Sequence, residues 1–170
     1  MTAVEPELAE LHAAAIEFLD AAGNAESVWA VPVAPGKWSP SQQVEHLART
    51  LDGAANVVDG TPSPFPNLPV VVRPLLRIFF FNRTVKRGAF PRSRTFKALN
   101  PTEGPPNSAA AKARLDAAVQ RFEQACRGRA SSGETIATST FGTIPIASYA
   151  RFQAIHIRHH RKQLPVAVRV

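Results

Sequence analysis

Apolar residues recur at helical spacing in four long segments of this chain, and this periodicity constrains the fold more than any other feature. The segments cover residues 7–22, about 40–58, about 108–127 and about 146–164. Spacings of three and four residues place apolar side chains on one face of a helix, whereas a strand requires strict alternation. The stretch 28–33 is the only strand candidate, and it is short. We therefore expect an all-α protein in which four amphipathic helices bury their apolar faces against one another in a bundle.

The second of these helices has the clearest signals at its ends. Ser39 is followed by Pro40 and Gln42, the pattern of a capping box, in which the serine and glutamine side chains bond to free backbone N–H groups. Gly60 is the expected end of the helix. Trp38 directly precedes the cap and is expected to pack onto the helix that it introduces.

A fifth, shorter helix is expected near residues 69–87, where Pro74 either kinks the helix or marks its true first turn. Ser108 is the expected cap of the fourth long helix, and residues 128–142 are expected to form a loop. No repeat and no long linker divides the chain. Residues 1–170 are therefore expected to form a single helical-bundle domain with long irregular loops.

Composition excludes several other classes of protein. Hydrophobic residues make up 45% of the 170 residues, which is enough for a packed core and unlike a disordered chain. The single cysteine, Cys126, excludes an intramolecular disulfide framework and a cysteine-based zinc cluster. The opening residues MTAVEPELAELH are acidic where a signal peptide needs bases, and the apolar run 68–81 is too short to span a bilayer. We therefore expect a cytoplasmic protein without a membrane partner.

Charge is distributed unevenly along the chain. Residues 1–60 hold nine acidic and two basic residues, a net of −7, whereas residues 61–170 hold four and eighteen, a net of +14. This asymmetry permits a surface for nucleic acid, with the arginines of residues 73–94 as candidates. It also permits acidic and basic helices that pack side by side, within one chain or between two copies. The arginines are scattered and form no Lys/Arg run, which favours helix pairing, and the aromatic run 79–81 is expected to be core or pocket wall.

The five histidines carry the clearest chemical signal: His12, His46, His156, His159 and His160. His156 and His160 are one helical turn apart and about 40° apart around the axis, so both rings can reach a common point. Such a pair can hold a metal ion, but a pair alone is more often a surface feature or already satisfied. His46 lies beside the apolar stripe of the second helix. It either supplies a third ligand from a facing helix or is half-buried and bonded to water or backbone.

Several motifs of the chain resemble the DinB-like (DinB/YfiT) superfamily. The segment GKWSPSQQVEHLA resembles that superfamily's second helix. The segment FGTIPIASYARFQAIHIRHHRKQL resembles its closing helix, with a His-x-x-His-His-x-x-Gln pattern after a Phe-Gly turn. Between them, LPVVVRPLLRIFFFNRTVKRG and KALNP resemble the middle of one bacterial branch. The likeness covers most of the chain and implies a four-helix bundle of the DinB/YfiT type with an additional short or kinked helix.

The resemblance also implies a divalent-metal cofactor and a homodimer. In the superfamily, one second-helix histidine and two last-helix histidines four residues apart bind the metal, usually zinc or nickel. The matching positions are His46, His156 and His160, whereas His159 matches an additional histidine that is not normally a ligand. The implied activity is thiol S-transfer or hydrolysis, with a small-molecule substrate or a low-molecular-weight thiol as partner.

Three neutral imidazoles would leave a divalent ion with its full charge and an open position for a water or a thiolate. No general base is evident, because Glu45 points about 100° away from His46 around the helix, and Asp52 and Glu134 have no placed geometry. The candidates for supporting the histidine rings are Gln43, Gln153 and Gln163. One alternative is a binding protein that holds a small ligand or metal without turnover. A nucleic-acid-associated protein ranks below both.

Overall fold

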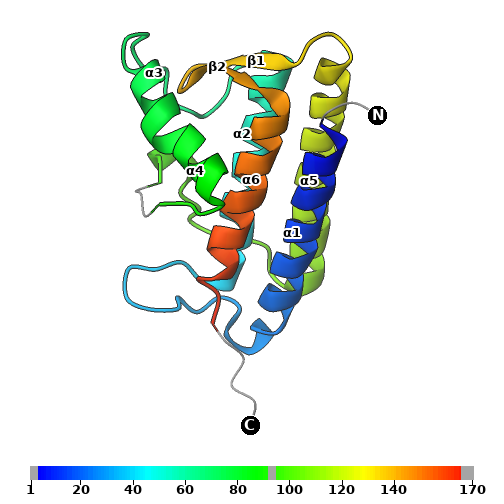
Figure 1. The fold of residues 1–170 in the computed structure, drawn as a ribbon. Coiled ribbons are helices and arrows are strands. Elements are labelled where there is room, and N and C mark those ends of the chain that lie inside the picture. The colour runs from blue at the N-terminus through cyan, green and yellow to red at the C-terminus, as the bar shows by residue number, and fades with distance from the viewer. Residues whose placement is uncertain (1–3, 92–94, 166–170) are drawn as a thin grey trace.

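Four long helices lie side by side and form the body of the molecule (Figure 1). They are α1 (Glu5–Gly23), α2 (Pro40–Asp59), α5 (Ser108–Ala130) and α6 (Ile146–Arg161). The structure is a computed structural model and describes residues 4–91 and 95–165. The expected all-α class is confirmed, with four main helices and one shorter, interrupted helical segment.

The four helices form two closely packed pairs, α1 with α6 and α2 with α5. Small side chains allow the first pair to approach closely, because Ala14 and Ala15 of α1 and Ala150 and Ala154 of α6 are all buried. Large, fully buried side chains complete the core: Leu8, Leu11, Phe18, Leu47, Leu51, Leu115 and Phe122. The apolar faces expected from the sequence periodicity are therefore the faces that the bundle buries.

Local signals set the ends of α2 as expected. The Ser39 hydroxyl accepts the backbone N–H of Gln42, and the Gln42 side chain accepts the backbone N–H of Ser39, which completes the capping box. Gly60 has the left-handed φ of 71° that ends the helix. At the start of α5, Asn107 is the cap instead of Ser108, because its side-chain oxygen accepts a backbone N–H of the first turn.

A shorter helical segment, which we call the helical arm, packs against α6 on the side away from α1 (Figure 1). It consists of α3 (Arg73–Leu76), a π-helix (η2, Arg77–Asn82) and α4 (Arg83–Arg87). Pro74 lies in the first turn of α3 and therefore marks the start of the arm. Gly88, with a φ of 62°, ends it.

The π-helix turns three successive phenylalanines in different directions. Phe79 is 67% exposed, Phe80 is half-buried and Phe81 is 1% exposed. The expectation that this run forms core or pocket wall is confirmed for the last two and is wrong for Phe79. Although the arm carries the longest apolar run, no helix within residues 4–91 and 95–165 combines the length and apolar character needed to cross a bilayer.

Residues 128–142, expected to form a loop, contain the end of α5 and most of a β-hairpin. Strands β1 (Thr135–Thr138) and β2 (Gly142–Pro145) pair antiparallel, with Ile136 opposite Ile144 and both side chains buried. Each strand has only four residues, which is too short for alternation to stand out in the sequence. The strand candidate at 28–33 is also wrong, because a 3-10 turn (η1, Glu26–Val28) and further turns occupy that region.

The acidic side chains of α1 and α2 pair with arginines of α5 and α6. The inter-helix ion pairs are Glu5–Arg127, Glu10–Arg158, Glu17–Arg161, Glu45–Arg114, Asp52–Arg114 and Asp52–Arg121. Each lies partly in solvent and contributes at most about 1 kcal/mol. Five of the nine acidic residues of residues 1–60 thus pair with arginines of the same chain, so neutralisation between its own helices accounts for part of the charge asymmetry. Arg92 and Arg94, two candidates for nucleic-acid contact, lie outside the described residues.

Candidate metal centre

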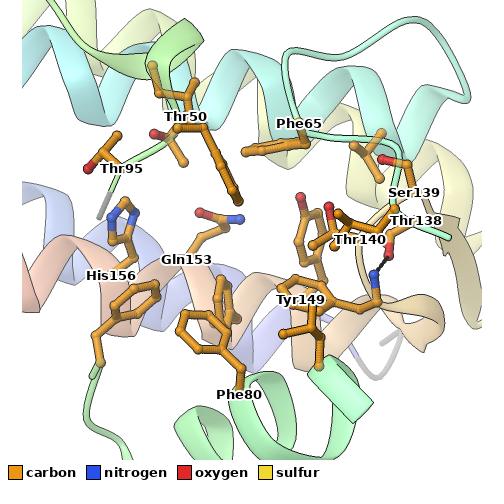
Figure 2. Close-up of a pocket in the computed structure, with 18 of the residues that line it drawn as sticks. Thr50, Phe65, Phe80, Thr95, Thr138, Ser139, Thr140, Tyr149, Gln153 and His156 are labelled. Atoms are coloured by element: carbon orange, nitrogen blue, oxygen red, sulfur yellow. Dashed lines mark hydrogen bonds between the residues drawn. The ribbon is translucent and has the colours of Figure 1, made fainter. Parts of the chain in front are cut away.

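A cavity of about 300 Å³ lies beside α2 and α6, under the helical arm (Figure 2). His46 of α2 and His156 of α6 both line it. The arm contributes Leu76 and Phe80 to the wall, and the hairpin region contributes further residues. These histidines are therefore positioned where a small molecule could contact them.

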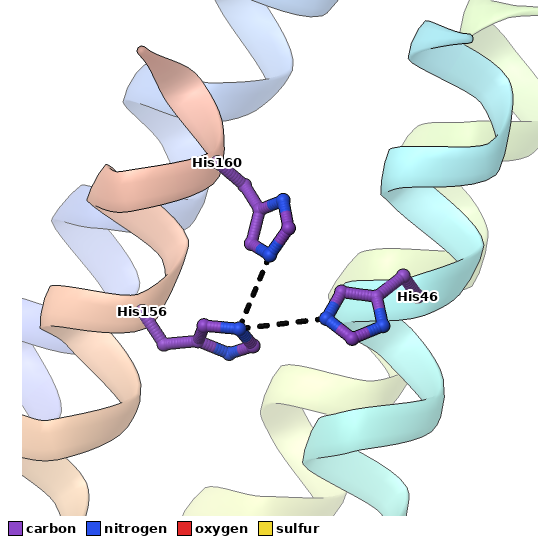
Figure 3. Close-up of side chains that lie close together, drawn as sticks. All are labelled: His46, His156 and His160. Carbon is purple, nitrogen blue, oxygen red and sulfur yellow. Dashed lines mark hydrogen bonds between the residues drawn. The ribbon is translucent and has the colours of Figure 1, made fainter. Parts of the chain in front are cut away.

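His46, His156 and His160 converge between α2 and α6 (Figure 3). The Nε2 atom of His156 lies 3.4 Å from Nε2 of His46 and 3.1 Å from Nε2 of His160. One ring nitrogen from each residue lies within 4.8 Å of the other two. All three side chains are buried, with 2%, 8% and 5% exposed for His46, His156 and His160. Two facing helices thus bring the three residues predicted from the sequence to one point.

The helix patterns explain this placement. Tyr149, Phe152, His156 and His160 follow one stripe of α6, and all four side chains are buried. On α2, His46 lies on the buried face of a helix with a strong amphipathic pattern. Its burial excludes the half-buried alternative that the sequence left open.

A backbone hydrogen bond sets the protonation of the His46 ring. Nδ1 of His46 lies 3.0 Å from the carbonyl oxygen of Leu99, at the end of a 3-10 turn (η3, Lys97–Leu99). A carbonyl oxygen can only accept, so Nδ1 carries the proton. Nε2 of the neutral ring therefore presents its lone pair to the other two histidines.

The surroundings hold all three rings in the neutral form. Burial lowers the pKa of His46 to about 4, and the hydrogen bond to Leu99 opposes this only in part. Burial, followed by the charges of the other histidines, lowers the pKa of His156 well below its usual value. Burial, followed by the charges of His46 and His159, lowers the pKa of His160 in the same direction. Neutral imidazoles are the form that binds metal ions.

The donor set fits a divalent metal ion. Tetrahedral ligands about 2.0–2.1 Å from zinc are about 3.3–3.4 Å apart, close to the two Nε2 separations measured from His156. Moreover, the Nδ1 atom of His160 is buried without a hydrogen-bond partner in the described part of the chain. Imidazole nitrogens suit zinc and nickel among the common divalent ions.

Two aromatic side chains enclose the rings. Trp38 stacks on His160, with centroids 6.0 Å apart and planes at 17°, and lies 4.6 Å from the ring centroid of His46. Phe90 lies 4.7 Å from the ring centroid of His156. The sequence indicated that Trp38 packs on α2 but gave no sign that it contacts the histidines, and Phe90 carried no signal at all. Both contacts depend on tertiary structure.

Comparison with known protein families agrees with this architecture. Residues 7–164 match the family model of the DinB superfamily. The chain belongs to the DinB superfamily. No curated protein and no solved structure matches it. Membership in the superfamily and the buried three-histidine group are together compatible with metal binding.

The two other histidines of this DinB-superfamily protein lie outside the cluster. His159 is half-buried, and its ring lies 5.5 Å from the ring centroids of both Phe90 and His160. His12 is on α1 with its side chain largely exposed, and its Nδ1 lies 3.5 Å from Glu123. Neither residue supplies a nitrogen to the group of three.

The carboxylates considered as general bases also lie elsewhere. Glu45 pairs with Arg49 and Arg114, and Asp52 pairs with Arg114 as well. Glu134 is exposed directly before β1. No acidic residue in the described part of the chain lines the cavity. The described groups in the cavity that could transfer a proton are therefore the histidines and the hydroxyl of Tyr149.

Gln43 and Gln153, which we expected to support the histidine rings, have other hydrogen-bond partners. Gln43 donates to the backbone oxygen of Gln163 at 3.4 Å, and its own side-chain oxygen is buried without a partner among the described residues. Gln153 lines the cavity and hydrogen-bonds with Tyr149. The partner of His46 is instead the backbone carbonyl of Leu99, which a pattern of residue types cannot reveal.

Proposed function

We propose that this DinB-superfamily protein binds a divalent metal ion, zinc or nickel, through His46, His156 and His160. The observation that supports these ligands most strongly is the convergence of three neutral, buried ring nitrogens from two facing helices. The carbonyl of Leu99 orients one ring, and Trp38 covers two of them. This support is typical of metal sites, where neighbouring groups orient the ligands.

We further propose that the site serves thiol S-transfer to a small molecule in the cavity. A divalent ion bound by three imidazoles supplies Lewis-acid chemistry, which lowers the pKa of a thiol or a water. The chain keeps the three histidines neutral by burial, and the aromatic rings limit access of water. A thiol that has lost its proton needs no further base to attack, whereas hydrolysis gains from one. The absence of a carboxylate from the described cavity wall therefore favours thiol transfer over hydrolysis.

Metal content of protein purified without a histidine tag tests the ligands directly. Plasma mass spectrometry of the wild type should give close to one zinc or nickel per chain. The variants His46→Ala and His156→Ala should lose the metal. His12→Ala is the matched control, since it removes a histidine far from the cluster and should retain the metal. A wild type that stays folded and free of metal, even after dialysis against zinc or nickel, would refute the site.

A non-catalytic binding protein is the second candidate, and the lack of an acidic residue in the described cavity wall also supports it. Turnover separates the two candidates. The metal-loaded protein should accelerate the reaction of a neutral electrophile with at least one of a panel of low-molecular-weight thiols, and His46→Ala should abolish this. Metal-loaded protein that binds the electrophile without accelerating its reaction with any thiol would identify a binding protein.

A further inference from the structure

No charged residue appears among the described residues that line the cavity. Aromatic and aliphatic side chains predominate: Val57, Phe65, Leu68, Leu76, Phe80, Phe90, Phe96, Leu99, Phe141 and Phe152. No aspartate, glutamate, lysine or arginine of the described chain lines it. This absence is notable in a chain with 20 basic and 13 acidic residues. A charged ligand placed there would lose its hydration without gaining a counter-charge from a side chain.

Three of the six hydroxyl side chains that line the cavity are already bonded to backbone carbonyls. Thr50 donates to the carbonyl of His46 at 2.8 Å, Thr138 to that of Gly142 at 3.0 Å, and Thr140 to that of Pro66 at 3.3 Å. Burial raises the pKa of Tyr149, so its hydroxyl stays neutral. The cavity is therefore less polar than the number of threonines in its wall suggests, because three of these hydroxyl groups already have partners.

The cavity is elongated, with different chemistry at its two ends. Figure 2 shows His156 and Thr95 at one end, the residues of the hairpin turn at the other, and Gln153 between them. Tyr149, Gln153 and His156 follow one face of α6 and span about 10 Å along the helix axis. A volume of about 300 Å³ is at the small end for ligand pockets, so it suits one compact molecule.

We infer that this cavity selects an uncharged, largely apolar small molecule, aromatic or aliphatic, whose one reacting group lies at the His46 and His156 end. Phenylalanine rings contact the apolar body, and Gln153 offers an amide to one polar atom along its length. The inference deepens the proposed function and depends on it only for the end at which the molecule reacts. The described part of the cavity wall offers an organic acid or a phosphorylated compound no basic side chain as a counter-charge, so we expect such compounds to bind less well than neutral ones.

Binding of a neutral dye tests the apolar wall. N-phenyl-1-naphthylamine, whose fluorescence rises in apolar surroundings, should bind the full-length protein. Leu76→Glu places a carboxylate in the wall and should weaken binding by about tenfold or more. Ile16→Glu is the control, because Ile16 is also a large aliphatic residue but is 49% exposed on α1 and outside the cavity. Circular dichroism of both variants shows whether they fold.

A pair of competing ligands tests charge selection without any mutation. 4-Phenylbutanamide and 4-phenylbutanoate have nearly the same shape and differ in charge. The amide should displace the dye at about tenfold or more lower concentration than the carboxylate after the protein has been treated with a chelator. If the carboxylate competes well in metal-loaded protein but poorly in metal-free protein, it binds the ion rather than the cavity wall. Metal-free protein that prefers the amide supports the inference in that case as well. A carboxylate that competes as well as the amide in both forms would overturn it.

Two variants separate this inference from the metal site. His160 does not line the cavity, so His160→Ala should lose the metal and keep the dye. Leu76→Glu should keep the metal and lose the dye. A wild type that binds the dye but no metal would refute the proposed function and leave the apolar cavity standing. A metal-loaded wild type that binds neither the dye nor the amide would refute the inference alone.

Discussion

The two sides of α6 differ in how they are packed. On one side, α1 approaches α6 through alanines, and arginines of α6 pair with glutamates of α1 across the edge of the contact. On the other side, α2 and the helical arm are separated from α6 by histidine rings, phenylalanine rings and a cavity. We call these the closed side and the open side. Close packing of small residues on the closed side holds α6 in place, so that the open side can bury polar groups that contribute little to stability.

The first prediction compares core packing on the two sides. Phe18→Ala removes a fully buried ring of α1, the helix of the closed side, and should lower the free energy of unfolding by about 3–5 kcal/mol. Phe90→Ala removes a half-buried ring beside His156 and should cost about 1–2 kcal/mol, because less apolar surface is lost. Urea unfolding of metal-free protein measures both. Equal losses would contradict the division into a closed and an open side.

The second prediction concerns the pH dependence that the open side should impose. The pKa of His46 is about 4 in the folded chain and about 6.5 in an unfolded one. Between these values the unfolded chain binds more protons, so the free energy of unfolding falls as the pH falls. Metal-free protein should lose about 3 kcal/mol through His46 between pH 7 and pH 4.

Urea unfolding at several pH values measures this loss, and the variant His46→Gln isolates it. Between pH 7 and pH 4, the free energy of unfolding of His46→Gln should fall by about 3 kcal/mol less than that of the wild type. The control His12→Ala should show the same fall as the wild type. If the wild type and His46→Gln show the same pH dependence, His46 is not held neutral by burial.

The third prediction adds metal to the open side. Free zinc at about 100 times its dissociation constant should stabilise the folded protein by about 2.7 kcal/mol. The gain should be absent in His160→Ala and retained in His159→Ala, which alters the adjacent residue outside the cluster. Thermal unfolding with and without zinc measures both. The gain should persist down to about pH 5, because burial lowers the pKa of His46 to about 4, and it should disappear only at lower pH, where protons compete with the metal for the imidazoles. Identical unfolding with and without metal at every pH from about 5 to 8 would refute the three-histidine site.

Features that depend on residues close together in the sequence were predicted better than features that depend on long-range contacts. The capping box at Ser39 and the turn spacing of His156 and His160 depend on residues within a few positions of one another, and both were evident in the sequence. The likeness to a known family supplied the third histidine. The contact of Trp38 with the ring of His160 joins segments more than 100 residues apart. Such contacts, and the cavity itself, follow from how the helices pack and leave no periodic pattern.

The hairpin was missed for a related reason. Ile136 and Ile144 are buried opposite each other, but each belongs to a strand of four residues surrounded by threonine, serine and glycine. Those residue types also occur in loops, so composition favoured a loop. Cys126 illustrates the opposite case, because it follows Leu115, Val119 and Phe122 at helical spacing, and that local pattern alone is enough to predict its burial. The structure buries it fully and raises its pKa to about 12, which makes it unreactive.

The last and smallest expected effect is that of salt on dimerisation, which we place at the solvent-exposed face of the helical arm. Five acidic residues of α1 and α2 already pair with arginines of the same chain, so charge alone gives little reason to dimerise. The helical arm and the segment just before it nevertheless expose large apolar residues, namely Leu75, Ile78 and Phe79 in the arm and Val70 and Val71 before it. We expect a second copy to cover these residues, because burial of apolar surface supplies most of the affinity of such contacts.

Sedimentation equilibrium at micromolar protein should therefore give a mass near twice 18.4 kDa that changes little with salt. Phe79→Ser should shift the protein toward the monomer, whereas Ile16→Ser should not, because Ile16 is exposed on α1 away from the arm. A wild type that is monomeric throughout would refute the dimer. A dimer dissociated by moderate salt would show that charge pairs between copies drive association, and the open side would then remain uncovered.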